Sequence, residues 1–175
     1  AISFHWEGKV LPETRSAWEH YGEEALRALV EAFPGRVIGH AHPRAFDRFA
    51  GIYAGLGIPP VADFEQVVQR ADVYACDGVS TLYEFASTDR PVVVLNAPWY
   101  RRDVEHGLRF WEYADVGVQC DEPEGLVAAV QRALRDTPDQ KERRRRAIGA
   151  VYPHRGDAAH RAAEAITDLA VEWRG

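Results

Sequence analysis

The stretch ACDGVSTLYEFASTDRPVVVLN, residues 75–96, contains the pattern that indicates the fold of this chain. A short apolar run ends at Asp77-Gly78, a helix-like segment occupies residues 80–87, and a valine-rich run occupies residues 91–95. Valine-rich runs of this length are typical of strands that are buried on both faces of a parallel sheet. The stretch therefore predicts two parallel strands that are joined by a helix.

The same alternation of short apolar runs and longer periodic segments continues on both sides of this stretch. We expect strands at residues 2–6, 36–40, 72–76, 91–95 and 116–120, and a very short one at 61–62. We expect helices at residues 14–33, 44–56, 64–70, 80–87, 106–113, 123–136, 138–150 and 157–173. This alternation predicts an α/β fold of the Rossmann-like type, with a parallel sheet in three layers and helices on both faces.

The composition restricts the classes of function. The net charge of −6 argues against a general binder of nucleic acids or of anionic membranes. No apolar run approaches the roughly 18 residues of a membrane span, and no signal peptide is evident. Cys76 and Cys120 lie in expected strands, so we interpret them as buried thiols of a cytoplasmic protein. The chain has no methionine, from which we expect a processed chain, an excised domain or a fragment.

The loop at residues 77–80 follows an expected strand, and ligands of such folds bind at the carboxyl ends of strands. Gly78 permits a sharp turn and a close approach of the backbone. Ser80 or Thr81 would cap the next helix, whose free N–H groups can bind a phosphate. Glu84, on the same helix face, could accept hydrogen bonds from a ribose. The same residues also suit a plain turn with a capping serine and a surface glutamate.

Two histidines lie at the end of the expected strand at residues 36–40. Pro43 favours an extended conformation at His42, so that His40 and His42 would share one face. They could be a metal pair, but no third ligand is evident nearby in the sequence. Alternatively, His42 points at a diphosphate and Arg44 adds positive charge. The third interpretation is a buried, hydrogen-bonded histidine beside a surface arginine.

Three further stretches contain residues that could bind a ligand. Pro98-Trp99-Tyr100-Arg101-Arg102-Asp103 follows a strand, and its aromatic rings and arginines suit a base and a phosphate or form a solvated rim. The arginines of residues 143–146 would be spread around a helix, as a solvated face or as a docking site for an anionic polymer or lipid surface. His5-Trp6-Glu7-Gly8 follows the first strand, but nothing in the sequence defines its role.

Taken together, these residues resemble the carboxyl-terminal, nucleotide-binding domain of GT-B-type transferases, and most closely the CDP-glycerol glycerophosphotransferase (teichoic-acid polymerase) family. The resemblance covers about residues 36–168. His42-Pro43 matches the family's His-Pro, and residues 71–86 resemble its ADxxxTDYSSxxxDxA block, which Arg90-Pro91-Val92 follows. Residues 155–166 look like its terminal DGxAxxRxxxxI helix. The block is also similar to the DSGGxxxE of UDP-GlcNAc 2-epimerases.

The resemblance implies a role for each matching residue. His42 would be the catalytic residue that contacts the diphosphate and stabilises or protonates the leaving phosphate. Gly78, Ser80 and Thr81 would bind the diphosphate, and Glu84 would hold the ribose. The base would lie near residues 60–64. From the residues themselves, we expect Arg44 and Arg102 to add positive charge to this donor site.

The resemblance also implies that residues 1–175 form one half of a GT-B fold, a single donor-binding domain that lacks the amino-terminal acceptor domain. The donor would be a nucleotide sugar or CDP-glycerol, and no bound metal or other cofactor is expected. Nucleic acid is not an expected partner, whereas peripheral association of the full-length protein with the membrane is. The alternatives are a UDP-sugar 2-epimerase domain and a non-catalytic binding module that uses the arginines of residues 143–146.

Overall fold

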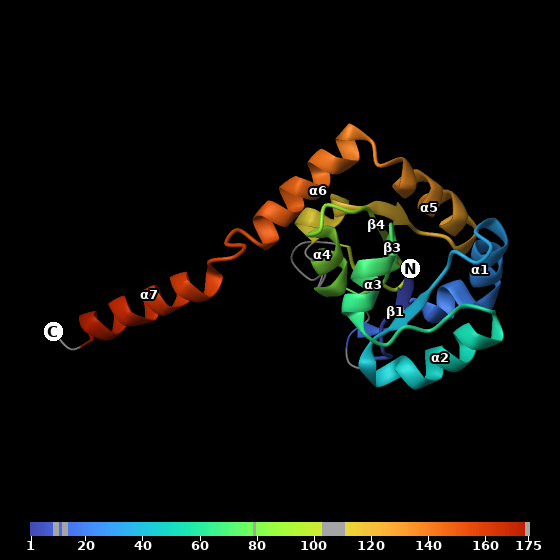
Figure 1. The fold of residues 1–175 in the computed structure, drawn as a ribbon, viewed down its shortest axis with the longest axis horizontal. Helices are drawn as coiled ribbons and strands as arrows, with labels where there is room; N and C mark the ends of the chain where they lie inside the picture. Colours follow the sequence, from blue (N-terminus) through green and yellow to red (C-terminus); the bar gives the residue numbers. More distant parts are fainter. Residues whose placement is uncertain (9–10, 12–13, 79, 103–110, 174–175) are drawn as a thin grey trace.

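The computed structural model describes residues 1–8, 11, 14–78, 80–102 and 111–173, and it shows a parallel sheet between two layers of helices (Figure 1). The strands pair in the order β2-β1-β3-β4-β5, with every pair parallel. Their bounds are β1 (Ile2–Phe4), β2 (Gly39–Ala41), β3 (Tyr74–Cys76), β4 (Val92–Leu95) and β5 (Val118–Cys120).

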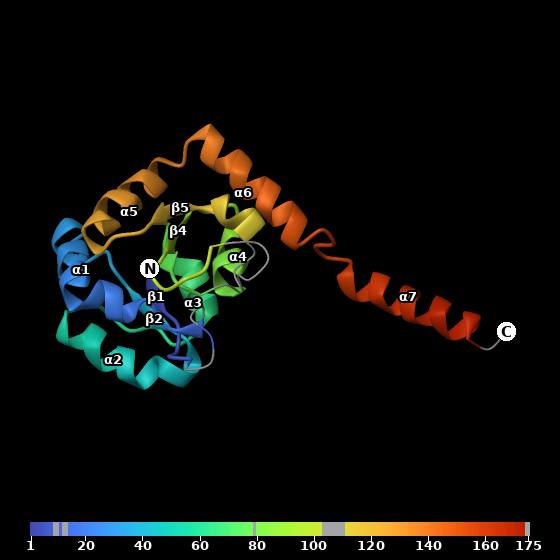
Figure 2. The same cartoon turned by 180° about the vertical axis from the view of Figure 1, so that it is seen from behind.

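Helices connect these strands on both faces of the sheet. The α-helices are α1 (Trp18–Ala32), α2 (Phe46–Gly55), α3 (Phe64–Arg70), α4 (Ser80–Ala86), α5 (Leu126–Arg135), α6 (Pro138–Val151) and α7 (Ala158–Glu172). Short 3₁₀ helices are η2 (Pro43–Ala45), η3 (Trp111–Val116) and η4 (Pro123–Gly125). Helices α1, α2 and α5 cover one face, and α3, α4 and α6 cover the other, as the two opposite views show (Figures 1 and 2). The predicted Rossmann-like α/β fold is thereby confirmed.

The valine-rich run of β4 shows why the sheet is buried on both sides. Successive side chains of a strand point to opposite faces. Accordingly, Val93 and Leu95 pack in the apolar cluster under α1, α2 and α5, whereas Val92 and Val94 pack in the cluster under α3, α4 and α6. All four side chains are buried. The expected interior thiols are confirmed as well, because both cysteines are free and buried.

The strand expected at residues 61–62 is reduced to one parallel bridge between Gly39 and Pro60. Gly39 N donates to the Pro59 carbonyl over 3.0 Å, and Val61 N donates to the Gly39 carbonyl over 2.8 Å. Proline has no backbone N–H, so the two successive prolines cannot extend the ladder. When this bridge is counted as a strand position beside β2, the order becomes 3-2-1-4-5-6, that of the doubly wound nucleotide-binding folds.

Several boundaries differ from the expected ones. The helix expected from residue 14 begins at Trp18, and the strands expected from residues 36 and 116 begin at Gly39 and Val118. The helices expected at residues 44–56 and 123–136 each open with a 3₁₀ turn that begins at a proline, Pro43 and Pro123 respectively. Of the helix expected at residues 106–113, residues 106–110 lie outside the described part, and η3 begins at Trp111.

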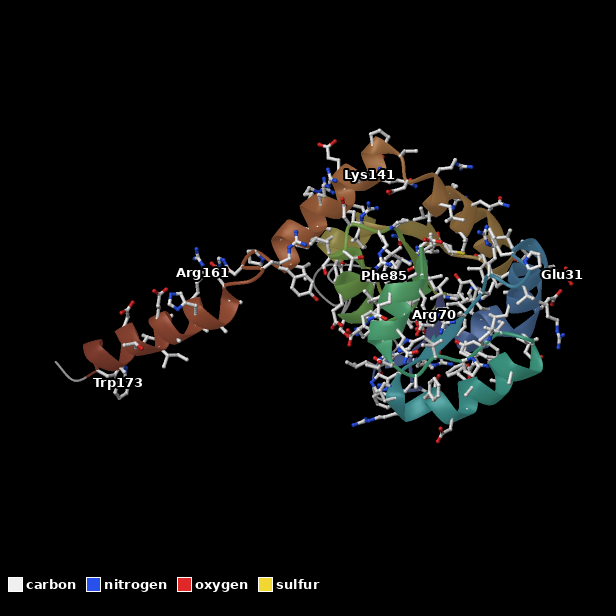
Figure 3. All side chains as sticks on the ribbon, viewed as in Figure 1. Glu31, Arg70, Phe85, Lys141, Arg161 and Trp173 are labelled. Carbon is white, nitrogen blue, oxygen red and sulfur yellow. The ribbon has the colours of Figure 1, made fainter. Side chains whose placement is uncertain are left out.

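Helix α7 extends away from the sheet and its covering helices (Figure 1). Figure 3 labels Arg161 on this helix and Trp173 directly after it, both clear of the rest of the chain. Three apolar side chains on α7 and directly after it are exposed: 67% for Ile166, 58% for Leu169 and 91% for Trp173. Among the described helices, none combines the length and the apolar character needed to cross a membrane.

Candidate functional site at the carboxyl edge of the sheet

The strand order reverses at β1, which lies between β2 and β3. The chain leaves β1 towards β2 on one side and later enters β3 on the other side. In doubly wound folds, the loops after the strands diverge at such a point, and ligands bind outside the carboxyl ends of the strands there. The residues that follow are His5 after β1, His42 after β2 and Asp77 after β3.

Asp77 connects three segments at this edge of the sheet. Its Oδ1 accepts a hydrogen bond from the His5 backbone N–H over 2.6 Å. Its Oδ2 accepts one from the Ala17 backbone N–H over 2.6 Å and one from the Ser16 hydroxyl over 3.2 Å. The side chain is buried. Asp77 thus fixes the loop after β1 and the start of α1 to the end of β3, a role that sequence analysis did not assign to it.

His5 is the residue around which the predicted site residues gather. Its imidazole lies edge-on to that of His42, with 4.9 Å between the ring centroids. A Cβ on Gly78 would lie 4.0 Å from His5 Cδ2 and 3.3 Å from Thr81 Oγ1. The structure therefore brings His42, Gly78 and Thr81 together around a histidine whose role the sequence left undefined.

Arg44 belongs to the same group. Its guanidinium lies over the Trp6 ring, with Cζ 5.0 Å from the ring centroid. Its backbone N–H donates to Nδ1 of His42 over 3.2 Å. Burial, followed by the nearby His5 and Arg44, lowers the pKa of His42, so its ring is neutral at pH 7. We call His5, Trp6, His42 and Arg44 the imidazole cluster.

A buried chain of polar groups leads from the sheet to Thr81. Nδ1 of His40 lies 3.0 Å from the Ser3 hydroxyl and 3.2 Å from the Tyr74 hydroxyl. The Tyr74 hydroxyl in turn donates to Thr81 Oγ1 over 3.3 Å. Burial lowers the pKa of His40 to about 4, so the ring is neutral. Of the three interpretations of the His40–Arg44 segment, the buried, hydrogen-bonded histidine describes His40.

The other residues of the expected phosphate and ribose site lie on α4. Ser80 is the first residue of α4 and is exposed, and Thr81 lies within its first turn rather than before it. Glu84 is exposed one turn further along. Burial and then the Glu84 carboxylate raise the pKa of Tyr152, which places Glu84 beside the end of α6. Its proposed contact with a ribose stays a prediction.

Arg102 lies at another part of the same edge. Its guanidinium pairs with Asp121 over 2.7 Å, directly after β5. Asn96, after β4, donates its Nδ2 to Asp121 over 2.8 Å and to Gln119 over 3.0 Å. Burial alone would raise the pKa of Asp121, but the hydrogen bonds from Arg102 and Asn96 outweigh it and lower that pKa. Because β5 is three positions from β1, this group is separate from the imidazole cluster.

The four arginines at residues 143–146 are each paired with an aspartate. Arg143 pairs with Asp139, Arg145 with Asp89, and Arg146 with Asp115. Arg144 is 1% exposed and pairs with Asp136 over 2.8 Å and with Asp89 over 3.3 Å. The pairs of Arg144, Arg145 and Arg146 connect α6 to other segments of the domain, whereas Arg143 and Asp139 both lie within α6. Docking of these arginines to an anionic polymer or lipid surface stays a prediction.

The described part of the chain contains several cavities away from the imidazole cluster, and one of about 350 Å³ lies beside Asp89, Arg144 and Arg155. One of about 370 Å³ lies at the amino-terminal edge of the sheet, where Ala1, Val73 and Leu134 contribute to its wall. Another of about 310 Å³ lies between β5 and α6. In the described part of the chain, no group of three or more histidine, cysteine or carboxylate side chains is arranged to hold a metal ion.

A comparison of the chain with protein-family models and with curated proteins found no match.

Proposed function

We propose that this chain is the donor-binding half of a GT-B-type glycosyltransferase or glycerophosphotransferase, which acts on a nucleotide-diphosphate-activated donor. The observation that carries the proposal is the imidazole cluster at the point where the strand order reverses. It combines His5, Trp6, His42 and Arg44, and Gly78 lies next to His5. Doubly wound folds bind nucleotide phosphates at this position.

The electrostatics of the cluster favour an anion. The chain has a net charge of −6, yet this edge presents the Arg44 guanidinium and two imidazoles. Among the described residues, the nearby carboxylate of Asp77 is turned to backbone N–H groups, and Glu7 is paired with Arg15 over 3.2 Å. Gly78 has no side chain between His5 and Thr81, so a phosphate can approach the backbone there.

His42 is the residue we assign to the chemical step. In its neutral form it would donate a hydrogen bond to the phosphate oxygen that leaves with the nucleotide. Positioning of the donor and stabilisation of this developing negative charge would supply the rate enhancement. The acceptor would come from a second domain, so this chain alone would bind the donor but turn it over slowly. Such an enzyme would work in the cytoplasm on a cell-surface polymer or glycan.

Isothermal titration calorimetry with CDP, UDP and GDP tests the proposal. We expect one of the three to bind selectively and His42→Ala to weaken it about tenfold, as expected for one lost hydrogen bond to a charged group. Glu84→Ala should weaken the nucleotide but not inorganic pyrophosphate, because the carboxylate is assigned to the ribose. His160→Ala, on the exposed α7, is the matched control. If none of the nucleotides binds at millimolar concentration, the proposal is refuted.

A further inference from the structure

We propose that the imidazole cluster binds a diphosphate together with a proton, and that His5 rather than His42 takes up this proton. The inference rests on the proposed function, because it concerns the same site and the same class of ligand. It goes further by giving the two neighbouring rings opposite roles, one as a neutral donor and the other as a cation that forms on binding.

The hydrogen bond to Arg44 determines the protonation of His42. The Arg44 backbone N–H points at Nδ1 of His42 over 3.2 Å, so this nitrogen carries the lone pair. In the neutral ring the proton is therefore on Nε2, which is free to donate. A second proton on Nδ1 would place two N–H groups against each other and break the bond. His42 is thus held as a neutral Nε2–H donor, in agreement with its lowered pKa.

His5 has the opposite arrangement. Its Nδ1 lies 3.1 Å from the Trp6 carbonyl oxygen, which can only accept a hydrogen bond. The proton of the neutral ring is therefore on Nδ1, and the lone pair is on Nε2. A proton added at Nε2 breaks none of the hydrogen bonds that the structure describes for this ring. His5 can accordingly become a cation without any rearrangement of its loop.

A bound anion would change the balance of charges around His5. On the side of β2, His5 faces the neutral ring of His42 and, next to that ring, the Arg44 guanidinium, which opposes a further positive charge. On the side of β3 it faces Asp77, which accepts its backbone N–H, and within its own loop Glu7 is paired with Arg15. A bound diphosphate adds several negative charges beside the ring and favours its protonated form. By linkage, affinity for the diphosphate must then rise as the pH falls.

Calorimetry in buffers of different ionisation enthalpy, PIPES and Tris at pH 7.5, measures protons taken up on binding. The ligands are inorganic pyrophosphate and the tightest of CDP, UDP and GDP. His5→Asn keeps an N–H near the Nδ1 position, and His42→Gln keeps one near the Nε2 position, but neither side chain titrates. We expect the wild type and His42→Gln to take up protons when the ligand binds. We expect His5→Asn to show only the proton exchange that comes from titration of the ligand itself. Between pH 8 and pH 6, the affinity of the wild type for the ligand should increase by a factor about ten times larger than that of His5→Asn.

Each outcome decides between the proposals. Uptake that persists in His5→Asn, or that disappears in His42→Gln while the ligand still binds, overturns the assignment to His5. Binding of a nucleotide with no uptake leaves the proposed function standing and overturns this inference. If pyrophosphate binds with proton uptake but no nucleotide binds, this inference stands and the proposed function is overturned. If none of the ligands binds, both are overturned.

Nitrogen-15 NMR of the imidazoles gives a test that needs no ligand. At pH 8 we expect His5 to be protonated at Nδ1 and His42 at Nε2, and the reversed assignment would overturn the inference. Circular dichroism of both variants establishes that they are folded.

Discussion

Replacement of Asp77 removes the group that holds the loop after β1, the start of α1 and the end of β3 together. The carboxylate accepts from two backbone N–H groups, each over 2.6 Å, and from the Ser16 hydroxyl over 3.2 Å. Hydrogen bonds to a charged group contribute about 1.5–3 kcal/mol each, and buried donors left without an acceptor add a further penalty. Because water can replace part of the loss, we expect Asp77→Ala to lower the free energy of unfolding by about 4 kcal/mol.

The variant Asp77→Asn tests the loss of one of the two acceptor oxygens of the carboxylate. An amide keeps one acceptor, but its NH₂ group must face the donors at the other position. We therefore expect a loss of about 2–3 kcal/mol, between wild type and Asp77→Ala. Urea unfolding at pH 7.5, followed by tryptophan fluorescence and circular dichroism, measures both variants. Asp168→Asn on the exposed α7 is the control. A loss of less than about 1 kcal/mol for Asp77→Ala would refute the tether.

Three further predictions concern stability. The pKa of His40 in the folded chain, about 4, lies below the ordinary 6.5, so the folded state binds fewer protons between these values. Stability should therefore fall by about 3 kcal/mol as the pH falls from 6.5 to 4, and His40→Gln should flatten this dependence in urea unfolding at stepped pH. Arg144→Met should cost about 3 kcal/mol by removing a buried guanidinium that pairs with both Asp136 and Asp89, while Arg143→Met stays within about 0.5 kcal/mol in the same assay. Gly117→Ala should lower the melting temperature, because its Cβ would lie 2.4 Å from the Val92 carbonyl oxygen. Gly149→Ala in α6, with nothing within 4 Å, should raise it. Equal shifts for the two glycines would contradict this reasoning.

The fold was predictable because its signals are local. The extent of α3 agrees with the prediction, and β4 was recognised from its valines alone. The starts of α1 and β5 could not be predicted in this way, because contacts with distant segments of the chain determine them. Ala17 is held by Asp77, 60 residues away, in a turn that the periodicity of the helix does not reveal. The shortening of the strand at residues 61–62 could have been predicted from the two prolines before it.

Part of the candidate site could also be predicted from local signals in the sequence. His42 and Gly78 follow expected strands, so their place at the carboxyl edge could be inferred from the strand pattern. The central position of His5 could not, since it depends on which strands are neighbours, and sequence spacing does not give the strand order. Arg102 also follows a strand, but its strand is far from β1 in the sheet. One signal for His5 was available, a histidine directly after the first strand of a doubly wound pattern.

The two polar groups at the carboxyl edge differ in their balance of charge. At the end of β5, Asp121 is neutralised by Arg102 and held by Asn96, so the charges of this group are balanced without a ligand. At the end of β1, none of the described carboxylates forms an ion pair with Arg44, which stacks on Trp6 instead. Because the His42 ring is neutral, the Arg44 guanidinium carries the positive charge of this group. An anion is the counter-charge that Arg44 lacks among the described residues, whereas Asp121 already neutralises Arg102, which argues for anion binding at β1 rather than at β5.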